Sequence, residues 1–469
     1  MTLWRARAAL LLVAVPALAA GTATGNRATP TELLARDILA ELVATDTYRA
    51  DDTGRTRDAA ERLAAILVRA RFPADDVQVL GLTPGDGNLV ARYRSANPTQ
   101  PPVLMLAHLD TVSTSPEFWT TSPLELVEKD GYYYGRGTRD IKSGAALLVA
   151  NFIRLRAEGF QPNRDLILLF TADEETTAAN LVWLLEKHRP LIDAAFALNT
   201  DAGQVELTAD GKPVAFTIQT AEKVYASYAL EATSAGGHSS RPAADNAIYK
   251  LARGLSRVEQ LRFPRDLNES VRVYFERWAP LAPPELQSAA RALGAGRLDD
   301  PTTGRLENSP YLNALIRTTC VATQLRGGTS ENALPAHARA VVNCRILPQS
   351  SPAAVEATLR HLVAADGVSV SPVAPALTAA PSPLDPQVLD PVEAIANELW
   401  PGIPVLPEMS PGASDGLYLR AAGIPTYGVG AVPEDPDEDT SHAPDERIRV
   451  EAFNQSLEYW YRLTRRLAE

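Results

Sequence analysis

Seven acidic or histidine side chains stand where a metal-dependent reaction could be built. They are His108, Asp110, Asp140, Glu174, Glu175, Asp201 and His442. Most of them fall at or just past the ends of predicted strands, and Asp140 ends a glycine-containing loop that begins at Gly135. Carboxylates crowded at one sheet edge repel each other and raise each other's pKa unless a cation is present. Histidine and carboxylate ligands without Cys suit a catalytic Zn²⁺ or a related divalent ion, and an acidic bridge suits a dinuclear centre.

Alternating strands and helices are predicted to position these side chains. The expected strands cover residues 103–106, 166–171 and 194–199, and the expected helices cover residues 143–158 and 178–188. This alternation is typical of an α/β domain with a mostly parallel sheet. Each of the three strands ends in carboxylates or His, which is where such sheets place ligand sites. We therefore expect the first part of a catalytic domain over residues 30–212.

The pattern changes near Pro213. Alternating residues between 215 and 232 predict antiparallel strands, and the polar segment 261–310 predicts a helical insertion. These segments belong to a small α+β unit that we place at residues 213–376. The α/β pattern returns over residues 377–469. The sequence therefore predicts one catalytic domain interrupted by an inserted domain.

The N-terminus has the features of a secretory signal peptide over residues 1–20. Arg5 and Arg7 precede an apolar run over residues 8–18, and the small-residue pattern Ala17-Leu18-Ala19 follows. We expect export to the periplasm or the medium, with an uncleaved anchor as the alternative. The apolar run is short for a bilayer about 30 Å thick.

Export makes the two cysteines, Cys320 and Cys344, candidates for a disulfide. They lie on strand-like runs at residues 315–324 and 338–347, on either side of a turn-rich segment. An antiparallel pairing centred near Asn332 would place them opposite each other. Two buried free thiols are the alternative.

Composition excludes several other classes of protein. The chain has 469 residues and a formal net charge of −12, with no long basic run. This charge argues against nucleic acid or an anionic membrane as a partner. Two Cys are too few for a Cys-rich zinc module or a disulfide-stapled fold.

Four separated motifs resemble those of a known family. They are Ala107-His108-Leu109-Asp110-Thr111-Val112, Tyr134-Gly135-Arg136-Gly137-Thr138-Arg139-Asp140-Ile141-Lys142-Ser143-Gly144, Asp173-Glu174-Glu175 and Gly236-Gly237-His238-Ser239-Ser240. In order and spacing they resemble the co-catalytic zinc metallopeptidases of family M20. This family includes aminoacylase, carboxypeptidase S, carnosine-type dipeptidases and succinyl-diaminopimelate desuccinylase. The resemblance runs from about residue 40 to the C-terminus and implies a zinc domain with an inserted lid or dimerisation domain.

The resemblance also implies a ligand set for two Zn²⁺ ions per subunit. Asp140 would bridge the two ions. His108 and Asp201 would complete one site, and Glu175 and His442 the other. Cobalt or manganese would fit the same ligands.

Further catalytic roles follow from the same resemblance. Glu174 would be the general base for a metal-bridging hydroxide, and Asp110 would hold the second ring nitrogen of His108. The peptide bond Asp140-Ile141 would be cis. His238 would reach across from a partner subunit and stabilise the tetrahedral intermediate, so the family pattern implies a homodimer.

Substrate recognition is implied at four positions. Arg345 matches a family arginine that binds a substrate carboxylate, and Asn332 matches a lid asparagine near the scissile group. Gly412 and Ser414 lie in a segment that resembles the loop lining the family's substrate pocket.

We therefore predict an exported dinuclear-zinc hydrolase that cleaves amide bonds of small peptides with a free carboxylate. Exopeptidase, carboxypeptidase and dipeptidase activities all fit, and Asp201 favours a peptidase because relatives that cleave di- and tripeptides tend to carry Asp there. An N-acyl-amino-acid deacylase is the first alternative, since it would share every catalytic residue. A non-catalytic binding protein on the same fold would lack a ligand or the base, and none is missing here.

Overall fold

The computed structural model describes residues 28–49, 55–434 and 438–469. The predicted signal peptide, residues 1–20, lies outside the described residues. None of the helices within these ranges combines the length and the apolar character that crossing a bilayer requires.

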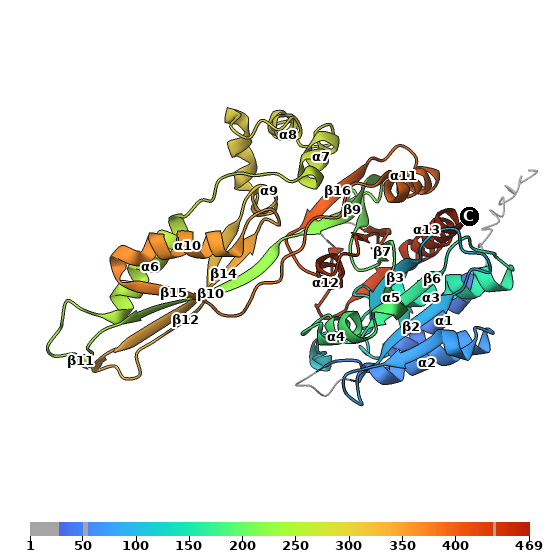
Figure 1. Ribbon diagram of the computed structural model, residues 1–469, viewed down its shortest axis with the longest axis horizontal. Helices are drawn as coiled ribbons and strands as arrows, with labels where there is room; N and C mark the ends of the chain where they lie inside the picture. The colour runs from blue at the N-terminus through green and yellow to red at the C-terminus, as the bar shows by residue number, and fades with distance from the viewer. Residues whose placement is uncertain (1–27, 50–54, 435–437) are drawn as a thin grey trace, which may run out of the picture.

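A large mixed sheet of ten strands forms the centre of the body of the molecule (Figure 1). Its order is β1 (Val77–Leu80), β2 (Asn88–Tyr93), β6 (Leu166–Thr171), β3 (Val103–His108), β7 (Phe196–Asn199), β17 (Thr426–Gly428), β9 (Pro213–Glu222), β8 (Gln204–Leu207) and β18 (Val432–Glu434), with β16 (Val405–Ser410) also beside β9. The four central strands from β6 to β17 are parallel, and antiparallel pairs lie outside them. The predicted α/β class is confirmed, with a sheet that is parallel at its centre and mixed at its margins.

Helices cover both faces of this sheet. One face carries α1 (Pro30–Val43), α2 (Thr56–Arg69), α3 (Lys142–Ala157), α11 (Pro386–Leu399) and α13 (Val450–Ala468), and the other carries α4 (Ala179–Lys187), α5 (Arg189–Ile192) and α12 (Asp415–Ala421). Side chains alternate between the faces of a strand. Met105 of β3 packs into the first layer accordingly, while Leu104 and Leu106 pack into the second. The continuous apolar runs of β3 and β6 are therefore those of strands buried on both sides.

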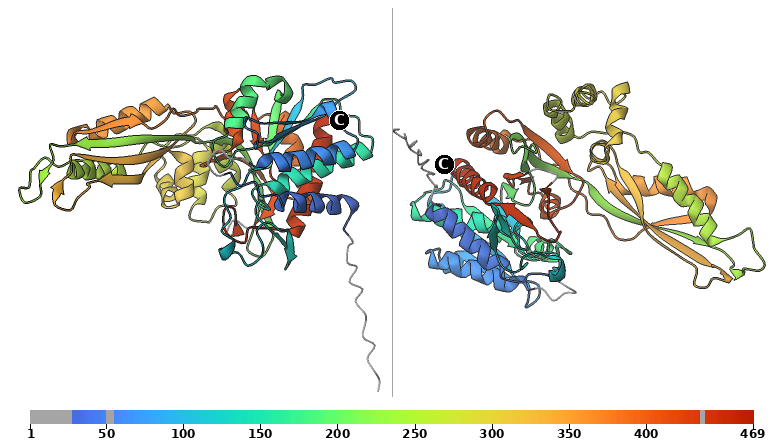
Figure 2. Two further views of the ribbon diagram at one scale, coloured as in Figure 1. Left: turned by 90° about the horizontal axis from the view of Figure 1, so that it is seen from below. Right: turned by 180° about the vertical axis from the view of Figure 1, so that it is seen from behind.

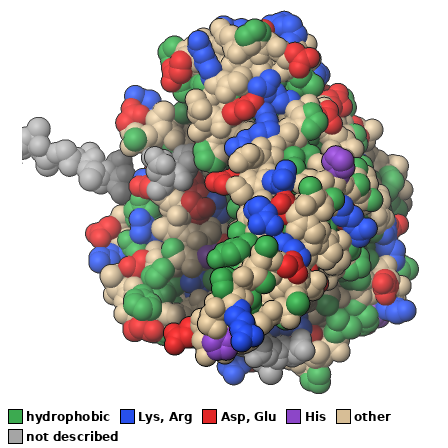
Figure 3. All heavy atoms as spheres, turned by 90° about the vertical axis from the view of Figure 1, so that its left-hand side faces the viewer, with side chains coloured by type: hydrophobic (Ala, Val, Ile, Leu, Met, Phe, Trp, Pro, Cys, Tyr) green, Lys and Arg blue, Asp and Glu red, His purple; other side chains and the backbone are tan. Residues whose placement is uncertain are grey.

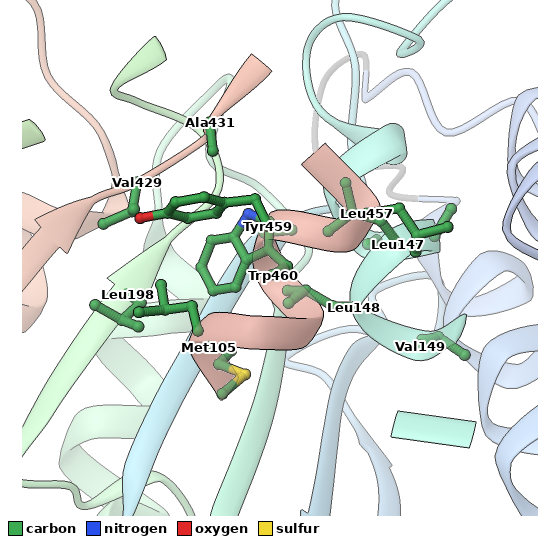
Figure 4. Packing of buried hydrophobic residues seen from close by; sticks show 14 of the residues in the cluster. Met105, Leu147, Leu148, Val149, Leu198, Val429, Ala431, Leu457, Tyr459 and Trp460 are labelled. Carbon is green, nitrogen blue, oxygen red and sulfur yellow. The ribbon is translucent and has the colours of Figure 1, made fainter. Parts of the chain in front are cut away.

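The first layer contains the largest apolar core. Figure 4 shows Trp460 of α13 packed between the sheet, at Met105 and Leu198, and Leu148 of α3. Trp460 and Met105 are fully buried. Large buried side chains of this kind hold the strands, and thus the loops at their carboxyl ends, in a fixed arrangement.

A second, smaller domain extends away from the body (Figures 1 and 2). Its antiparallel sheet has the order β12 (Thr319–Gly327), β14 (His337–Ile346), β10 (Val224–Thr233) and β15 (Val368–Pro372). Two helices, α6 (Ala247–Gln260) and α10 (Pro352–Val363), cover one face and form a separate core with it. At the far end, the two-residue strands β11 (Gly237–His238) and β13 (Ala333–Leu334) form a small pair.

Cys320 of β12 and Cys344 of β14 are register partners and are joined by a disulfide. The antiparallel pairing that would place the two cysteines opposite each other is confirmed. Of the two alternatives left open by the sequence, the structure shows the disulfide. The bond ties an edge strand to the middle of the second sheet.

The passage between the two domains differs from the prediction in detail. We placed the start of the inserted domain at residue 213, but β9, which begins at Pro213, belongs to the large sheet. The second sheet begins only with β10 at Val224. The predicted helical segment 261–310 contains α7 (Glu269–Trp278) and α8 (Gln287–Gly294), and with α9 (Pro310–Ile316) these pack on β9 and β16 of the body. β9 and β10 show the same alternating pattern in the sequence. This pattern therefore does not reveal that the chain passes from the large sheet to the second sheet between them.

Candidate metal centre

The carboxyl ends of three neighbouring parallel strands bring the predicted metal ligands together. β6, β3 and β7 lie side by side. His108 is the last residue of β3, Glu174 and Glu175 follow β6, and Asp201 follows β7. Because parallel strands end at the same edge of a sheet, these side chains meet there.

Two overlapping groups of potential ligands share Asp140. The first group is His108, Asp140 and Asp201, and the second is Asp140, Glu175 and His442, with the ligand atoms of each group within 4.8 Å of one another. His108 Nε2 lies 2.9 Å from Asp140 Oδ1. His442 Nε2 lies 2.9 Å from Asp140 Oδ2 and 3.0 Å from Glu175 Oε1. Asp140 thus offers one oxygen to each group, as a bridging ligand does.

The electrostatics of this cluster suit divalent cations. Burial, reinforced by nearby carboxylates such as Asp140 and opposed by His108, raises the pKa of Glu175 to about 7. Burial, with further contributions from Asp201 and other carboxylates, raises the pKa of Glu174 to about 10. A pair of divalent ions would stabilise these groups in their ionised forms. The donor set, two imidazoles and three carboxylates, is also one that zinc accepts, so the residues fit a dinuclear metal site.

Asp110 is placed differently from the expectation. His108 Nδ1 donates to the main-chain oxygen of Asp110 at 3.0 Å, while the Asp110 carboxylate Oδ1 lies 3.6 Å away. The carboxylate instead accepts hydrogen bonds from the main-chain N–H groups of Glu174 and Glu175, at 3.1 and 3.0 Å. Asp110 therefore orients His108 through its backbone and holds the Asp-Glu-Glu loop through its side chain.

Glu446 is a positioning residue that sequence reasoning did not identify. Its fully buried carboxylate accepts hydrogen bonds from Arg136 Nη1 at 2.6 Å and from the main-chain N–H groups of Gly137, Arg139 and Asp140 at 3.1, 2.8 and 3.0 Å. It lies four residues after His442, so it ties the segment that carries this ligand to the loop that carries Asp140. Its closeness to His442 in the sequence was the available signal, but its hydrogen-bond partners are more than 300 positions away.

The loop that ends at Asp140 has the predicted backbone form. The Asp140–Ile141 peptide bond is cis, as the resemblance implies. α3 begins at the following residue, Lys142.

A cavity of about 520 Å³ adjoins the Glu174 and Glu175 end of the cluster. Arg345 and Ser414 line it together with these two residues. Arg345 stacks over the ring of Tyr225 at 4.7 Å, and its Nη1 donates to the main-chain oxygen of Pro411 at 3.2 Å. Two of the four residues predicted to bind substrate thus lie beside the proposed base.

Hydrogen bonds and an ion pair to buried groups fix the loop of residues 410–414, which contributes to the wall of this cavity. Ser414 Oγ donates to the buried carboxylate of Glu222 at 2.5 Å, and Arg420 pairs with the same carboxylate at 2.7 Å. The main-chain N–H of Gly412 donates to Ser410 Oγ at 3.0 Å. The predicted residue Gly412 therefore stands in the same loop, two positions before Ser414.

His238 and Asn332 are not brought to this cluster within one chain. His238 is exposed on β11, at the far end of the second domain from the body (Figure 1). Asn332 lies beside it, because its main-chain oxygen accepts a hydrogen bond from the Ser239 N–H at 3.0 Å. The two residues thus share one location, remote from the five potential ligands.

Known sequences resemble this chain over most of its length. The family model described as peptidase family M20/M25/M40 matches residues 104–466. The N-fatty-acyl-amino acid synthase/hydrolase PM20D1 of Xenopus tropicalis is 28% identical over 375 residues, which cover 77% of this chain and 72% of that protein. Human aminoacylase-1 is 26% identical over 404 residues, covering 83% of this chain and 86% of that protein.

Solved structures share the fold. An M20 family metallo-carboxypeptidase from Sulfolobus solfataricus superposes with a TM-score of 0.68 at 19% identity, covering 93% of this chain and 99% of that one. A dinuclear metal-binding M20 peptidase from Bacillus subtilis gives a TM-score of 0.57 at 14% identity, covering 92% and 98% of the two chains.

Proposed function

Because the chain belongs to peptidase family M20/M25/M40, we propose that it is an exported dinuclear zinc exopeptidase acting on small peptides with a free C-terminal carboxylate. Members of this family are metal-dependent hydrolases of amide bonds, and the chain is one of them. The observation that carries the proposal is the pair of ligand groups sharing Asp140 beside a cavity that contains both Glu174 and Arg345.

The five clustered residues would hold the metal ions. His108 and Asp201 would bind one ion, Glu175 and His442 the other, and Asp140 both. When bound, two divalent ions act as Lewis acids and lower the pKa of a bound water from its value in bulk water towards about 7. The donor set supports zinc, and cobalt or manganese suits it as well.

Glu174 is the proposed general base. It lines the cavity next to Glu175, and Asp110 fixes its main-chain N–H. Glu174 would accept the proton of the attacking water and pass it to the leaving amine. Its orientation would depend on the Asp110 carboxylate, which makes Asp110 a positioning residue.

Arg345 is the proposed anchor for the substrate carboxylate. Its guanidinium has one hydrogen bond to Pro411 and lines the same cavity as Glu174. Guanidinium groups bind carboxylates through two parallel hydrogen bonds. A carboxylate bound there would place the adjoining amide bond next to the base and the ligand cluster.

A substrate panel on zinc-loaded protein tests this proposal. Dipeptides, the same dipeptides with an amidated C-terminus, and N-acetyl amino acids would be compared by kcat/KM. We expect the free dipeptides to be cleaved fastest and amidation to lower kcat/KM by at least about tenfold, because the carboxylate contact is lost. A preference for N-acetyl amino acids would favour the deacylase instead, a candidate supported by the similarity to aminoacylase-1.

We also propose that two copies of the chain form a homodimer through the second domain. Exposed apolar side chains line its edge strand and α6, with Leu325 68% and Tyr249 61% exposed. An apolar groove of about 420 Å³ lies between these two elements. Figure 3 faces the outer end of this domain and shows hydrophobic side chains among charged ones on its surface.

The dimer would bring His238 of one copy to the metal centre of the other. Light scattering on the purified protein should give about twice the mass of one chain. The full chain has a mass of 50.5 kDa, and removal of the predicted signal peptide would lower it. A monomer at micromolar concentration would contradict the dimer and leave His238 without a route to the cluster.

Export is supported by the Cys320–Cys344 disulfide, since such bonds persist in oxidising compartments. If the full chain is expressed in a bacterium, the recovered periplasmic or secreted protein should lack about the first 20 residues. Protein that remains in the cell with an intact N-terminus would contradict export.

A further inference from the structure

A second cavity, of about 430 Å³, adjoins the opposite end of the ligand cluster. Asp201 lines it, whereas Glu174 and Glu175 line the cavity that contains Arg345. The strand order places β6 with Glu174 on one side of β3 and β7 with Asp201 on the other, and β9, β8 and β16 lie beyond β7. These last three strands provide Gln204, Glu206, Thr217, Gln219 and Glu408 to the walls of the second cavity.

The walls of this cavity are acidic. Glu206 of β8 and Glu408 of β16 both line it, and no ion pair involves either one among the described residues. Glu408 Oε1 accepts a hydrogen bond from Tyr311 at 2.5 Å. Burial, with the charge of Glu408, raises the pKa of Glu206 to about 7. A cation bound between two such carboxylates would relieve their repulsion.

The positive charge already present in the walls is used elsewhere. Among the described residues that line the cavity, Arg139 is the one with a positively charged side chain. Its guanidinium pairs with Glu434 at 2.7 Å and donates to Gln204 at 3.3 Å. Arg139 is therefore engaged away from the Glu206 and Glu408 carboxylates.

A buried acceptor also faces this cavity. Gln219 is 4% exposed, lines the cavity from β9, and its Oε1 has no hydrogen-bond partner among the described residues. Leaving a buried carbonyl oxygen without a hydrogen-bond donor is unfavourable. A ligand that donates hydrogen bonds would satisfy it.

We infer that this second cavity is the subsite for the acyl side of the substrate and that it takes a group bearing an ammonium ion. The inference rests on the proposed function, because it assumes an amide bond placed at the ligand cluster. A substrate would then span the cluster with its carboxylate at Arg345 and its cation near Glu408 and Gln219. The ammonium ion comes either from a free α-amine or from a basic side chain.

The same walls disfavour a long apolar acyl chain. An alkyl chain would cover Glu206, Glu408 and Gln219 without giving any of them a hydrogen bond, and burying such groups unpaired is costly. The lining of this cavity therefore argues against fatty acyl substrates for this chain, although the chain is similar in sequence to an N-fatty-acyl-amino acid synthase/hydrolase.

Two pairs of substrates test the inference, each pair with the same C-terminal residue. Alanyl and propionyl amides differ only in the α-ammonium group, and 6-aminohexanoyl and hexanoyl amides differ only in a distal one. We expect kcat/KM to be at least about tenfold higher for the cationic member of one pair, since a hydrogen bond to a charged group contributes at least that factor. The pair that responds identifies the source of the cation.

Variants assign the effect to the cavity. The ratio of the two kcat/KM values should fall below about twofold in Glu408→Gln and in Glu206→Gln, because neutral side chains no longer attract the cation. Glu186→Gln, an exposed change of equal charge on α4, should keep the wild-type ratio. Equal kcat/KM values within both pairs, or a ratio that survives both cavity variants, would overturn the inference.

A binding measurement keeps the inference separate from the proposed function. If no amide is cleaved, the proposed function fails, and calorimetry then decides the subsite. Butylammonium should bind the metal-loaded wild type and lose at least about tenfold in affinity in Glu408→Gln, while butanol should not bind. Absence of butylammonium binding in that case would overturn the subsite as well.

Discussion

The ligand cluster of the body and the outer end of the second domain are built in opposite ways. The cluster lies at the ends of buried central strands, and hydrogen bonds from Asp110 and Glu446 hold the loops that carry its ligands. His238 and Asn332 instead sit on or next to two-residue strands, with exposed side chains and no contact with the cluster. The first region draws all of its potential ligands from one chain. The second can contribute to the reaction only if another copy presents it.

Glu174→Gln should produce the largest loss of activity, because it removes the proposed base beside the ligand cluster of the body. We expect kcat to fall by at least about 10³-fold, near the upper part of the range for general-base removal. Metal content, measured by plasma mass spectrometry, should remain at two ions per chain, because Glu174 belongs to neither ligand group. Substantial activity in this variant would remove Glu174 from the role of base.

His238→Ala should lower kcat by about 10²-fold through loss of oxyanion stabilisation. Metal content should not change, because the side chain is remote from the ligands in its own chain. An unaffected rate would contradict a catalytic contribution from the second domain.

Mixing the two variants sharpens the comparison between the regions. After subunit exchange between Glu174→Gln and His238→Ala proteins, half of the dimers would be mixed, and one of their two sites would have both residues. Activity should recover to about one quarter of the wild-type value in a two-fold symmetric dimer. The control is a chain that carries both substitutions. When it replaces either single variant in the mixture, activity should not recover. Failure of the mixture to exceed its components would place His238 outside the partner's active site.

Glu446→Gln should weaken the cluster without removing a ligand. Neutralising the carboxylate that holds Gly137, Arg139 and Asp140 should lower metal affinity by about 10- to 100-fold, the effect typical of groups that orient ligands. Competition with a chelator would measure this affinity. Glu451→Gln, on the exposed side of α13, should leave it unchanged, and equal affinities for the two variants would show that Glu446 does not position Asp140.

Removing the disulfide should have the smallest effect on chemistry. Replacing Cys320 and Cys344 by Ala opens a link between residues 24 positions apart, which corresponds to about 3 kcal/mol of unfolding free energy in the chain-entropy view. Denaturant unfolding followed in the second domain should report this loss, while metal content stays the same. Lower metal content would mean that the two regions depend on each other for stability.

Local pattern predicted much of what positions the site. The strand of residues 166–171 begins and ends where expected, because a short apolar run bounded by polar residues identifies a buried strand. The ligand set followed from the resemblance of the motifs to the family. Three of its members, His108, Glu175 and Asp201, also stand at or after the ends of predicted strands. Sequence order alone could then suggest that they meet, since parallel neighbours end at one edge.

Long-range pairing is what the sequence did not reveal. Glu446 contacts a loop more than 300 residues earlier, and no local pattern marks such a hydrogen bond. Glu206 and Glu408 face one cavity only because β8 and β16 both pair with β9. The expected strand over residues 315–324 begins instead at Thr319, because Ser309 and Pro310 start the short helix α9.

The metal content of wild-type protein and Asp140→Ala, after zinc saturation and desalting, tests the account most directly. Asp140 is the one residue common to both ligand groups. We predict two zinc ions per wild-type chain and fewer than about half an ion per Asp140→Ala chain, since loss of a bridge weakens both sites. Asp37→Ala, an exposed change on α1, is the control and should keep two ions. Two ions retained without Asp140, or fewer than two in active wild-type protein, would contradict a dinuclear centre bridged by this residue.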